Sequence, residues 1–243
     1  MLRRHINSQF LEYLVALPNG ETGTTRVPSL TEMSQQLGVS VARLREQLEV
    51  ARAMGLVEVH PRTGIHRQAY SFYPAVWQSL GYAIELDQGY FDSFAELRNH
   101  LEAAYWHQAV RLLTEDDHRE LQRLVASAWE KLHGPQVQIP QSEHRQLHMC
   151  IYRRLQNPFV LGLLEAYWEA YEAVGLNLYA GYEYMHQVWE YHQRMVDAIC
   201  SGDFNAGFRA LVEHTDLINH RPVSAMIGDN GKGISPAQLK EQS

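Results

Sequence analysis

Helical periodicity runs almost without a break from the segment YPAVWQSLGYAIEL, which begins at Tyr73, to about residue 222. Apolar residues recur every three or four positions, and short polar or proline-containing breaks such as HGPQVQIPQS and QNP divide the run. No part of it reads convincingly as a strand. The pattern predicts a mainly α protein in which residues 79–222 form an all-α bundle of six or seven helices.

The segment before this run, residues 1–74, shows a different order of elements. A short amphipathic helix comes first, with the apolar residues Phe10, Leu11, Leu14 and Val15, and it ends at LPNGETG. Ser29 and Glu32 have the spacing of a capping box at the start of a second helix, which Gly38 ends. Ser40 is placed to cap a third helix that stops at Gly55.

Beyond Gly55 the apolar period changes to two, around a turn with the sequence HPRTG, which predicts a β-hairpin. Two helices, a tight turn, a third helix and a hairpin form the order of a winged helix-turn-helix domain. The third helix of such a domain enters the major groove of DNA, and its outer face here carries Arg43, Arg45 and Arg52. The alternative is that these arginines only solvate a small interaction domain.

The run from RVPSLTEMSQQLGVS to HPRTG, residues 26–64, resembles the DNA-binding domain of the GntR family of bacterial transcription regulators. The resemblance places DNA contacts at Arg26, Arg45 and Gly64, with Ser40 opening the recognition helix. Together with the basic residues near them, the expected DNA-binding set is Arg26, Ser40, Arg43, Arg45, Arg62 and Gly64. Val41 stands where the family usually has arginine, so the operator preference of the family does not carry over.

Charge is divided unevenly between the two parts of the chain. Residues 1–75 hold eight arginines and six glutamates, a net charge of +2, and the whole chain has a net charge of −7. The remainder therefore carries −9, which suits a small nucleic-acid-binding head on an acidic body. Two cysteines in apolar helical patterns and no run of about 20 apolar residues indicate a cytoplasmic protein without a membrane span.

Four histidines lie on the apolar stripes of the predicted body helices. His144 and His148 share one stripe in HRQLH, one turn apart, while His192 and His214 each fall on the stripe of a later helix. Buried imidazoles without partners would cost about 1–3 kcal/mol each, and a shared divalent cation would remove that cost. The alternative is that they are ordinary hydrogen-bonded core residues.

The pattern HRQLH…NP followed by YHQRMVDAICSGDFNAGFRALVEH resembles the ligand-binding domain of the FadR subfamily of GntR regulators. Its metal-containing members use an aspartate and a histidine one turn apart together with two later histidines, which correspond to His144, His148, His192 and His214. His144 replaces the aspartate, so we expect a more positive site that prefers Zn²⁺ or Ni²⁺. The resemblance also places Arg98 where the family binds an effector carboxylate, with Tyr105 on the same side of that helix.

Four further alternatives concern the body. Arg98 and Glu102 could form an i,i+4 ion pair on a solvated surface. The aromatic run LEAYWEAYEAVGLNLYAGYEY could line a pocket, although such a stripe more often packs the core. Bound metal could instead serve a metal-dependent hydrolase, or could itself be the signal.

Taken together, the sequence predicts a homodimeric DNA-binding transcription regulator, not an enzyme, that recognises a pseudo-palindromic operator. A small organic acid bound at the metal and at Arg98 would control its affinity for that operator. Residues 223–243 are expected to form a flexible polar tail.

Overall fold

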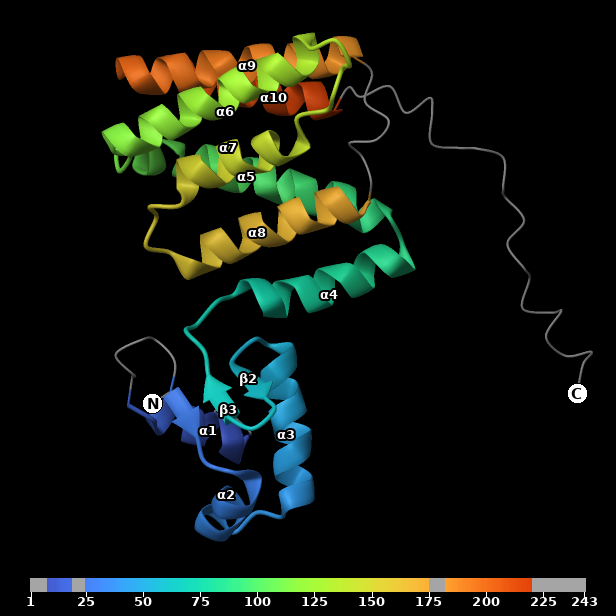
Figure 1. Cartoon of the computed structure of the whole chain (residues 1–243). Coiled ribbons are helices and arrows are strands. Elements are labelled where there is room, and N and C mark those ends of the chain that lie inside the picture. Colours follow the sequence, from blue (N-terminus) through green and yellow to red (C-terminus); the bar gives the residue numbers. More distant parts are fainter. Residues whose placement is uncertain (1–7, 19–24, 175–181, 220–243) are drawn as a thin grey trace, which may run out of the picture.

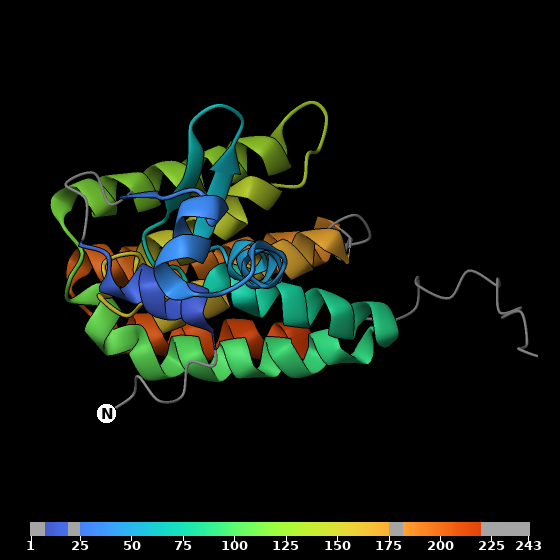
Figure 2. The same ribbon diagram turned by 90° about the horizontal axis from the view of Figure 1, so that it is seen from below.

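The computed structural model describes residues 8–18, 25–174 and 182–219 of the chain. A small head that contains all the strands lies beneath a larger body of helices, and α4 lies between them (Figure 1). Seen from below, the body helices run in roughly the same direction, whereas α3 of the head is viewed end-on (Figure 2). The predicted tail, residues 223–243, lies outside the described residues, and the predicted boundaries of the two domains remain a proposal.

Within the described residues, the head contains three helices and a small antiparallel sheet. Its elements in chain order are α1 (Gln9–Ala16), β1 (Thr25–Val27), α2 (Leu30–Leu37), α3 (Val41–Ala53), β2 (Val57–His60) and β3 (Gly64–Arg67). The strand order is β1-β3-β2, so the predicted hairpin is confirmed and gains a third strand, in which Val27 pairs with Ile65. This is the winged helix-turn-helix that the sequence predicts.

Capping groups fix where the head helices begin and end. Ser29 and Glu32 form the complete capping box of α2, and the Ser40 side chain accepts a hydrogen bond from the backbone of Arg43 at the start of α3. Gly38 has a φ of 66° and Gly55 a φ of 68°, which only glycine adopts without strain. The tight turn between α2 and α3 therefore follows from local sequence, as predicted.

The core of the head gathers one apolar face from each helix and the inner face of the sheet. Its buried residues are Phe10, Leu14, Val27, Met33, Leu44, Leu48, Ala51, Val57 and Ile65. Val15, which the sequence pattern assigns to the apolar face of the first helix, is 61% exposed. An eight-residue helix buries only about one position in four, so the neighbour of a buried leucine points to solvent.

The body contains seven helices within the described residues, in agreement with the predicted six or seven. They are α4 (Tyr73–Leu86), α5 (Gly89–Val110), α6 (Glu115–His133), α7 (Gln141–Tyr152), α8 (Pro158–Ala173), α9 (Tyr182–Ser201) and α10 (Phe204–Asn219). Thr114 caps α6 in a capping box with Asp117, and Asn157 caps α8 immediately before Pro158.

These helices form layers, with α5 and α7 between the α4/α8 pair and the α6/α9/α10 group (Figure 1). The main core lies between α5, α6, α7, α9 and α10, while a second cluster fills the space between α4, α5 and α8. This arrangement brings the inward faces of α5, α7, α9 and α10 to one region near the centre of the body.

Two glycines allow close contacts along the segment that joins head and body. A Cβ on Gly55, at the end of α3, would lie 2.5 Å from Cγ of Pro74. A Cβ on Gly162 of α8 would lie 2.6 Å from the backbone nitrogen of Tyr73 and 2.9 Å from Cβ of Phe72. The connecting segment is therefore packed against the C-terminal end of α3 on one side and against α8 on the other.

Candidate metal and effector site

Three helices bring four histidines together in the centre of the body. His144 and His148 lie one turn apart on α7, His192 lies on α9 and His214 on α10, and one ligand nitrogen from each lies within 4.8 Å of the others. The Nε2 atoms of His148 and His192 are 3.1 Å apart, and the ring centroids of His192 and His214 are 4.5 Å apart. The structure thus brings together all four histidines that the sequence singled out.

Burial determines the charge of these rings. His148, His192 and His214 have no solvent exposure, and His144 is 5% exposed. Burial lowers the pKa of His148, His192 and His214 well below its ordinary value, and the positive charge of Arg98 adds to the effect. The three imidazoles are therefore neutral at pH 7, which is the form that binds metal ions.

The histidine cluster fits a divalent cation. Three ring nitrogens have no hydrogen-bond partner within the described part of the chain. They are Nδ1 and Nε2 of His214 and Nδ1 of His192. Leaving such buried groups unsatisfied costs about 1–3 kcal/mol each. Imidazole nitrogens suit Zn²⁺, Ni²⁺, Cu²⁺ and Fe²⁺, so a set of neutral, converging imidazoles could hold such an ion.

Arg98 and Glu102, one turn apart on α5, lie directly beside the cluster. Nη2 of Arg98 is 2.9 Å from Nδ1 of His148 and 3.0 Å from a Glu102 oxygen, and that oxygen is 3.1 Å from the same His148 nitrogen. Arg98 is 2% exposed and Glu102 fully buried, so the pair does not lie on a solvated surface. Burial raises the pKa of Glu102 to about 6, although Arg98 opposes the rise.

The position of Glu102 was not predicted as part of the site. Its spacing of four from Arg98 was the available signal, because that spacing puts both side chains on the same face of a helix. Arg98 was predicted to contact an effector carboxylate, and the structure shows that a carboxylate of the protein itself already lies against it. Any acid that binds Arg98 must share it with Glu102.

Tyr105 and Glu143 lie apart from the cluster. Tyr105 is seven residues beyond Arg98, about 10 Å along the helix axis, and its hydroxyl accepts a hydrogen bond of 3.3 Å from the side chain of Asn157. The structure therefore does not bring Tyr105 to the histidines. Glu143 pairs with Lys131 at 2.6 Å and accepts a hydrogen bond from Ser127, so its carboxylate is directed away from the histidines.

The residues predicted to contact DNA are all exposed on the head. Arg43 and Arg45 lie on the outer face of α3, Ser40 caps its N-terminus, and Arg26 lies in β1. Arg62 and Gly64 lie at the β2–β3 tip with φ angles of 74° and 88°, which makes Arg62 the one non-glycine residue with positive φ among those described. Such a tip is a tight turn that presents its side chains to solvent.

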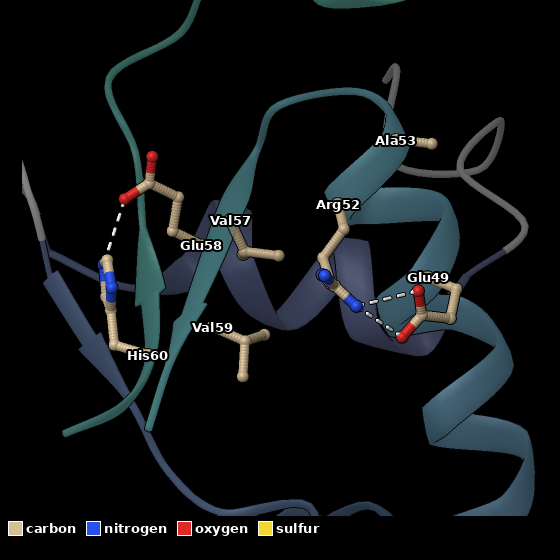
Figure 3. Close-up of a pocket in the computed structure, with 7 residues that line it drawn as sticks. All are labelled: Glu49, Arg52, Ala53, Val57, Glu58, Val59 and His60. Atoms are coloured by element: carbon tan, nitrogen blue, oxygen red, sulfur yellow. Dashed lines mark hydrogen bonds and ion pairs between the residues drawn. The ribbon is translucent and has the colours of Figure 1, made fainter. Parts of the chain in front are cut away.

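The C-terminal part of α3 borders a shallow hollow of about 560 Å³ against β2 (Figure 3). Arg52 reaches Glu49 at 3.0 Å, and His60 reaches Glu58 at 3.0 Å. Because each basic group in the hollow is matched by a carboxylate, this surface is a poor site for DNA phosphate. Arg43 and Arg45, which belong to the predicted DNA-binding set, lie at the other end of α3.

A winged helix-turn-helix head joined to an all-α body that encloses a buried polar centre defines a DNA-binding regulator with a ligand-binding domain. Residues 93–217, half of the chain, match the FCD domain family. The chain belongs to this family, and it is a GntR-family transcription regulator with an FCD domain of the FadR type.

A solved GntR structure shows the same fold. A GntR protein of Streptococcus agalactiae is 18% identical, with a TM-score of 0.63 over 88% of this chain and 97% of that one. The McbR/YncC protein of Escherichia coli is 19% identical, with a TM-score of 0.47 over 88% of this chain and 94% of that one. No curated protein matches the sequence. None of the described helices combines the length and apolar character that a membrane crossing needs.

Proposed function

We propose that a small carboxylate, bound at a metal ion in the FCD domain, sets the affinity of this regulator for its operator. The observation that carries the proposal is the convergence of four buried histidines, three of them held neutral by burial, directly beside a buried arginine. Among the described residues, Glu102 is the one anionic group in contact with this set of neutral ring nitrogens and Arg98. The centre therefore favours an anion from outside.

His144, His148, His192 and His214 would hold the metal, and the ion would supply a Lewis acid to which a carboxylate oxygen binds. Zn²⁺ or Ni²⁺ is the expected metal. The resemblance to the FadR subfamily places an aspartate where this chain has His144. An imidazole in that place leaves the site one charge unit more positive, which strengthens its attraction for an anion.

Arg98 is well placed to hold the acid. Its guanidinium lies 4.8 Å from the ring centroid of Tyr167 and 5.3 Å from that of Trp168, and these rings fix its plane. Its Nε has no hydrogen-bond partner within the described residues, which leaves a donor for a second carboxylate oxygen. Arg98 can thus donate hydrogen bonds to an incoming carboxylate even though it also contacts Glu102.

On the DNA side, we propose that the exposed basic residues of α3, β1 and the β2–β3 tip contact the operator. A helix fits the major groove, where Arg43 and Arg45 would reach base edges or phosphates and Ser40 would contact the backbone. Arg26, Arg62 and Gly64 would contact the neighbouring backbone. A homodimer would present two such heads to a pseudo-palindromic site, with half-sites about one helical turn apart.

The contacts of Gly162 and Gly55 support a physical connection between the two sites. Trp168, which packs against His144 and His148, lies on the same helix as Gly162. Gly162 lies against Phe72 and Tyr73, and the neighbouring Pro74 lies against Gly55 at the end of α3. A shift of α8 on acid binding would therefore move that segment and the recognition helix. Acid binding changes operator affinity only to the extent that the acid binds the shifted arrangement of α8 more tightly than the unshifted one, or the reverse.

The test uses the full-length protein and a duplex operator selected from random sequences. Fluorescence anisotropy would measure operator affinity for metal-free protein, for nickel-loaded protein, and for nickel-loaded protein with lactate, malonate or propanoate. The proposal expects at least one acid to change the affinity only when metal is present. A response to nickel alone would make the metal the signal, and hydrolysis of model esters without any DNA affinity would replace the regulator by a metal-dependent hydrolase.

A further inference from the structure

Trp168 and Trp189 pack against the histidine cluster, and neither indole N–H donates a hydrogen bond to any described residue. Trp168 of α8 packs against His144 and His148, with ring centroids 4.7 and 5.2 Å apart. Trp189 of α9 lies 4.7 Å from His192 and 6.3 Å from His144. Both side chains are at most 1% exposed, and their Nε1 atoms have no hydrogen-bond partner in the described part of the chain.

Other tryptophans of the body use the same group. Nε1 of Trp106, which is also fully buried, donates to the backbone oxygen of Phe204 at 2.9 Å, and Nε1 of Trp129 donates to Gln193 at 3.2 Å. A buried indole normally finds an acceptor, because losing its hydrogen bond to water is costly. Among the described residues, the two buried indoles without an acceptor are the two that contact the four clustered histidines.

Three buried donors of the centre have no acceptor within the described residues, and both oxygens of Glu102 and several ring nitrogens of the cluster also lack a hydrogen-bond partner there. Besides the two indoles, Nε of Arg98 also has no partner within the described residues, and the buried carboxylate, Glu102, already lies against Arg98 and His148. The ring of His144 contacts both tryptophans. A molecule that satisfies these donors would bring an acceptor oxygen to the indoles as well as one to Arg98.

We propose that Trp168 and Trp189 determine effector specificity by donating hydrogen bonds to an oxygen that the acid carries besides the carboxylate held by Arg98. The inference rests on the proposed function and narrows its ligand. The effector is a small acid with a second oxygen function, either a hydroxyl group or a second carboxylate. A simple aliphatic acid fills the carboxylate position only and leaves the indole donors unsatisfied.

Calorimetric titration of full-length, nickel-loaded protein tests this with propanoate, lactate and malonate, which have the same number of carbon atoms. Trp168→Phe and Trp189→Phe keep an aromatic ring and remove the N–H. At least one of them should weaken lactate or malonate binding about five- to tenfold and change propanoate binding less than twofold. Trp129→Phe, whose indole bonds elsewhere, should leave all three affinities unchanged.

A second measurement needs no substitution. In protein labelled with ¹⁵N at tryptophan, the indole resonances of two tryptophans should shift downfield on addition of lactate or malonate, and much less with propanoate. Equal losses of affinity for all three acids, or no loss, would overturn the role of the indoles while leaving the proposed function intact. Failure of the wild-type protein to bind any of the acids would overturn both.

Discussion

Replacing Gly162 by alanine should destabilise the protein, although alanine is the better helix former. The new Cβ would lie 2.6 Å from the backbone nitrogen of Tyr73 and 2.9 and 3.0 Å from two atoms of Phe72. Alanine gains about 1 kcal/mol of helix propensity, but overpacking costs about 1–3 kcal/mol. Because two of the three contacts are with backbone atoms, the upper end applies, and the net loss should be about 2 kcal/mol.

Gly81→Ala on α4 is the matched control, because a Cβ at Gly81 meets no atom within 4 Å. This variant should be more stable than the wild type by about 0.5–1 kcal/mol. Urea unfolding followed by tryptophan fluorescence measures both free energies, and the five tryptophans provide the signal. If Gly162→Ala were as stabilising as Gly81→Ala, the close contact of α8 with the connecting segment would be refuted.

Gly162→Ala also tests the connection between the histidine cluster and the DNA-binding head. Gly162→Ala should bind acid and operator separately with affinities close to those of the wild type, whereas the effect of acid on operator affinity should shrink. Anisotropy with the selected operator measures this effect. An unchanged acid response would show that the signal does not pass through α8 and the segment at Phe72.

Three other results are expected. Burial alone would raise the pKa of Asp117, but hydrogen bonds from two arginines and Thr114 hold that pKa well below its ordinary value. Asp117→Asn should therefore cost about 2 kcal/mol at pH 7. Urea unfolding should show the difference from wild type beginning to decline as the pH falls below about 4, the ordinary pKa of an aspartate, and disappearing only as the pH approaches the depressed pKa of the folded state. Arg45→Ala should weaken operator binding and, where Arg45 contacts phosphate, reduce the slope of log affinity against log salt by about 0.9; an unchanged affinity in the anisotropy assay would contradict this. Glu102→Gln should tighten malonate binding measured by calorimetry by at least about tenfold, since it removes a negative charge beside Arg98, whereas Glu169→Gln on the surface should not.

Local signals made the head predictable. Ser29, Glu32 and Ser40 cap their helices through their own hydrogen bonds, so residues within one turn determine those helix ends. The hairpin was predicted from a change of period and a turn sequence. Strand β1 was missed, because three residues show no period and their pairing with β3 is a contact between segments about 40 residues apart.

The histidine site was only partly predictable, because local sequence shows which residues face inward but not which helices meet. Periodicity shows that His148 or His192 faces inward, and the structure brings these rings together. It does not show which inward faces meet, so the family resemblance was needed to group histidines from three helices. Glu102 and Trp168 were assigned to a surface pair and a core stripe, because only the packing of α5 and α8 against α7 shows that they contact the same histidine.

The most direct test of the account is the binding of a divalent ion by the four histidines. Calorimetric titration of metal-free, full-length protein with Ni²⁺ should give one ion per chain. The double variant His148→Ala, His192→Ala should bind none, while His100→Ala, an exposed histidine of α5, should bind as the wild type does. Stoichiometric nickel binding that survives the double substitution, or wild-type protein that takes up no ion, would contradict the account.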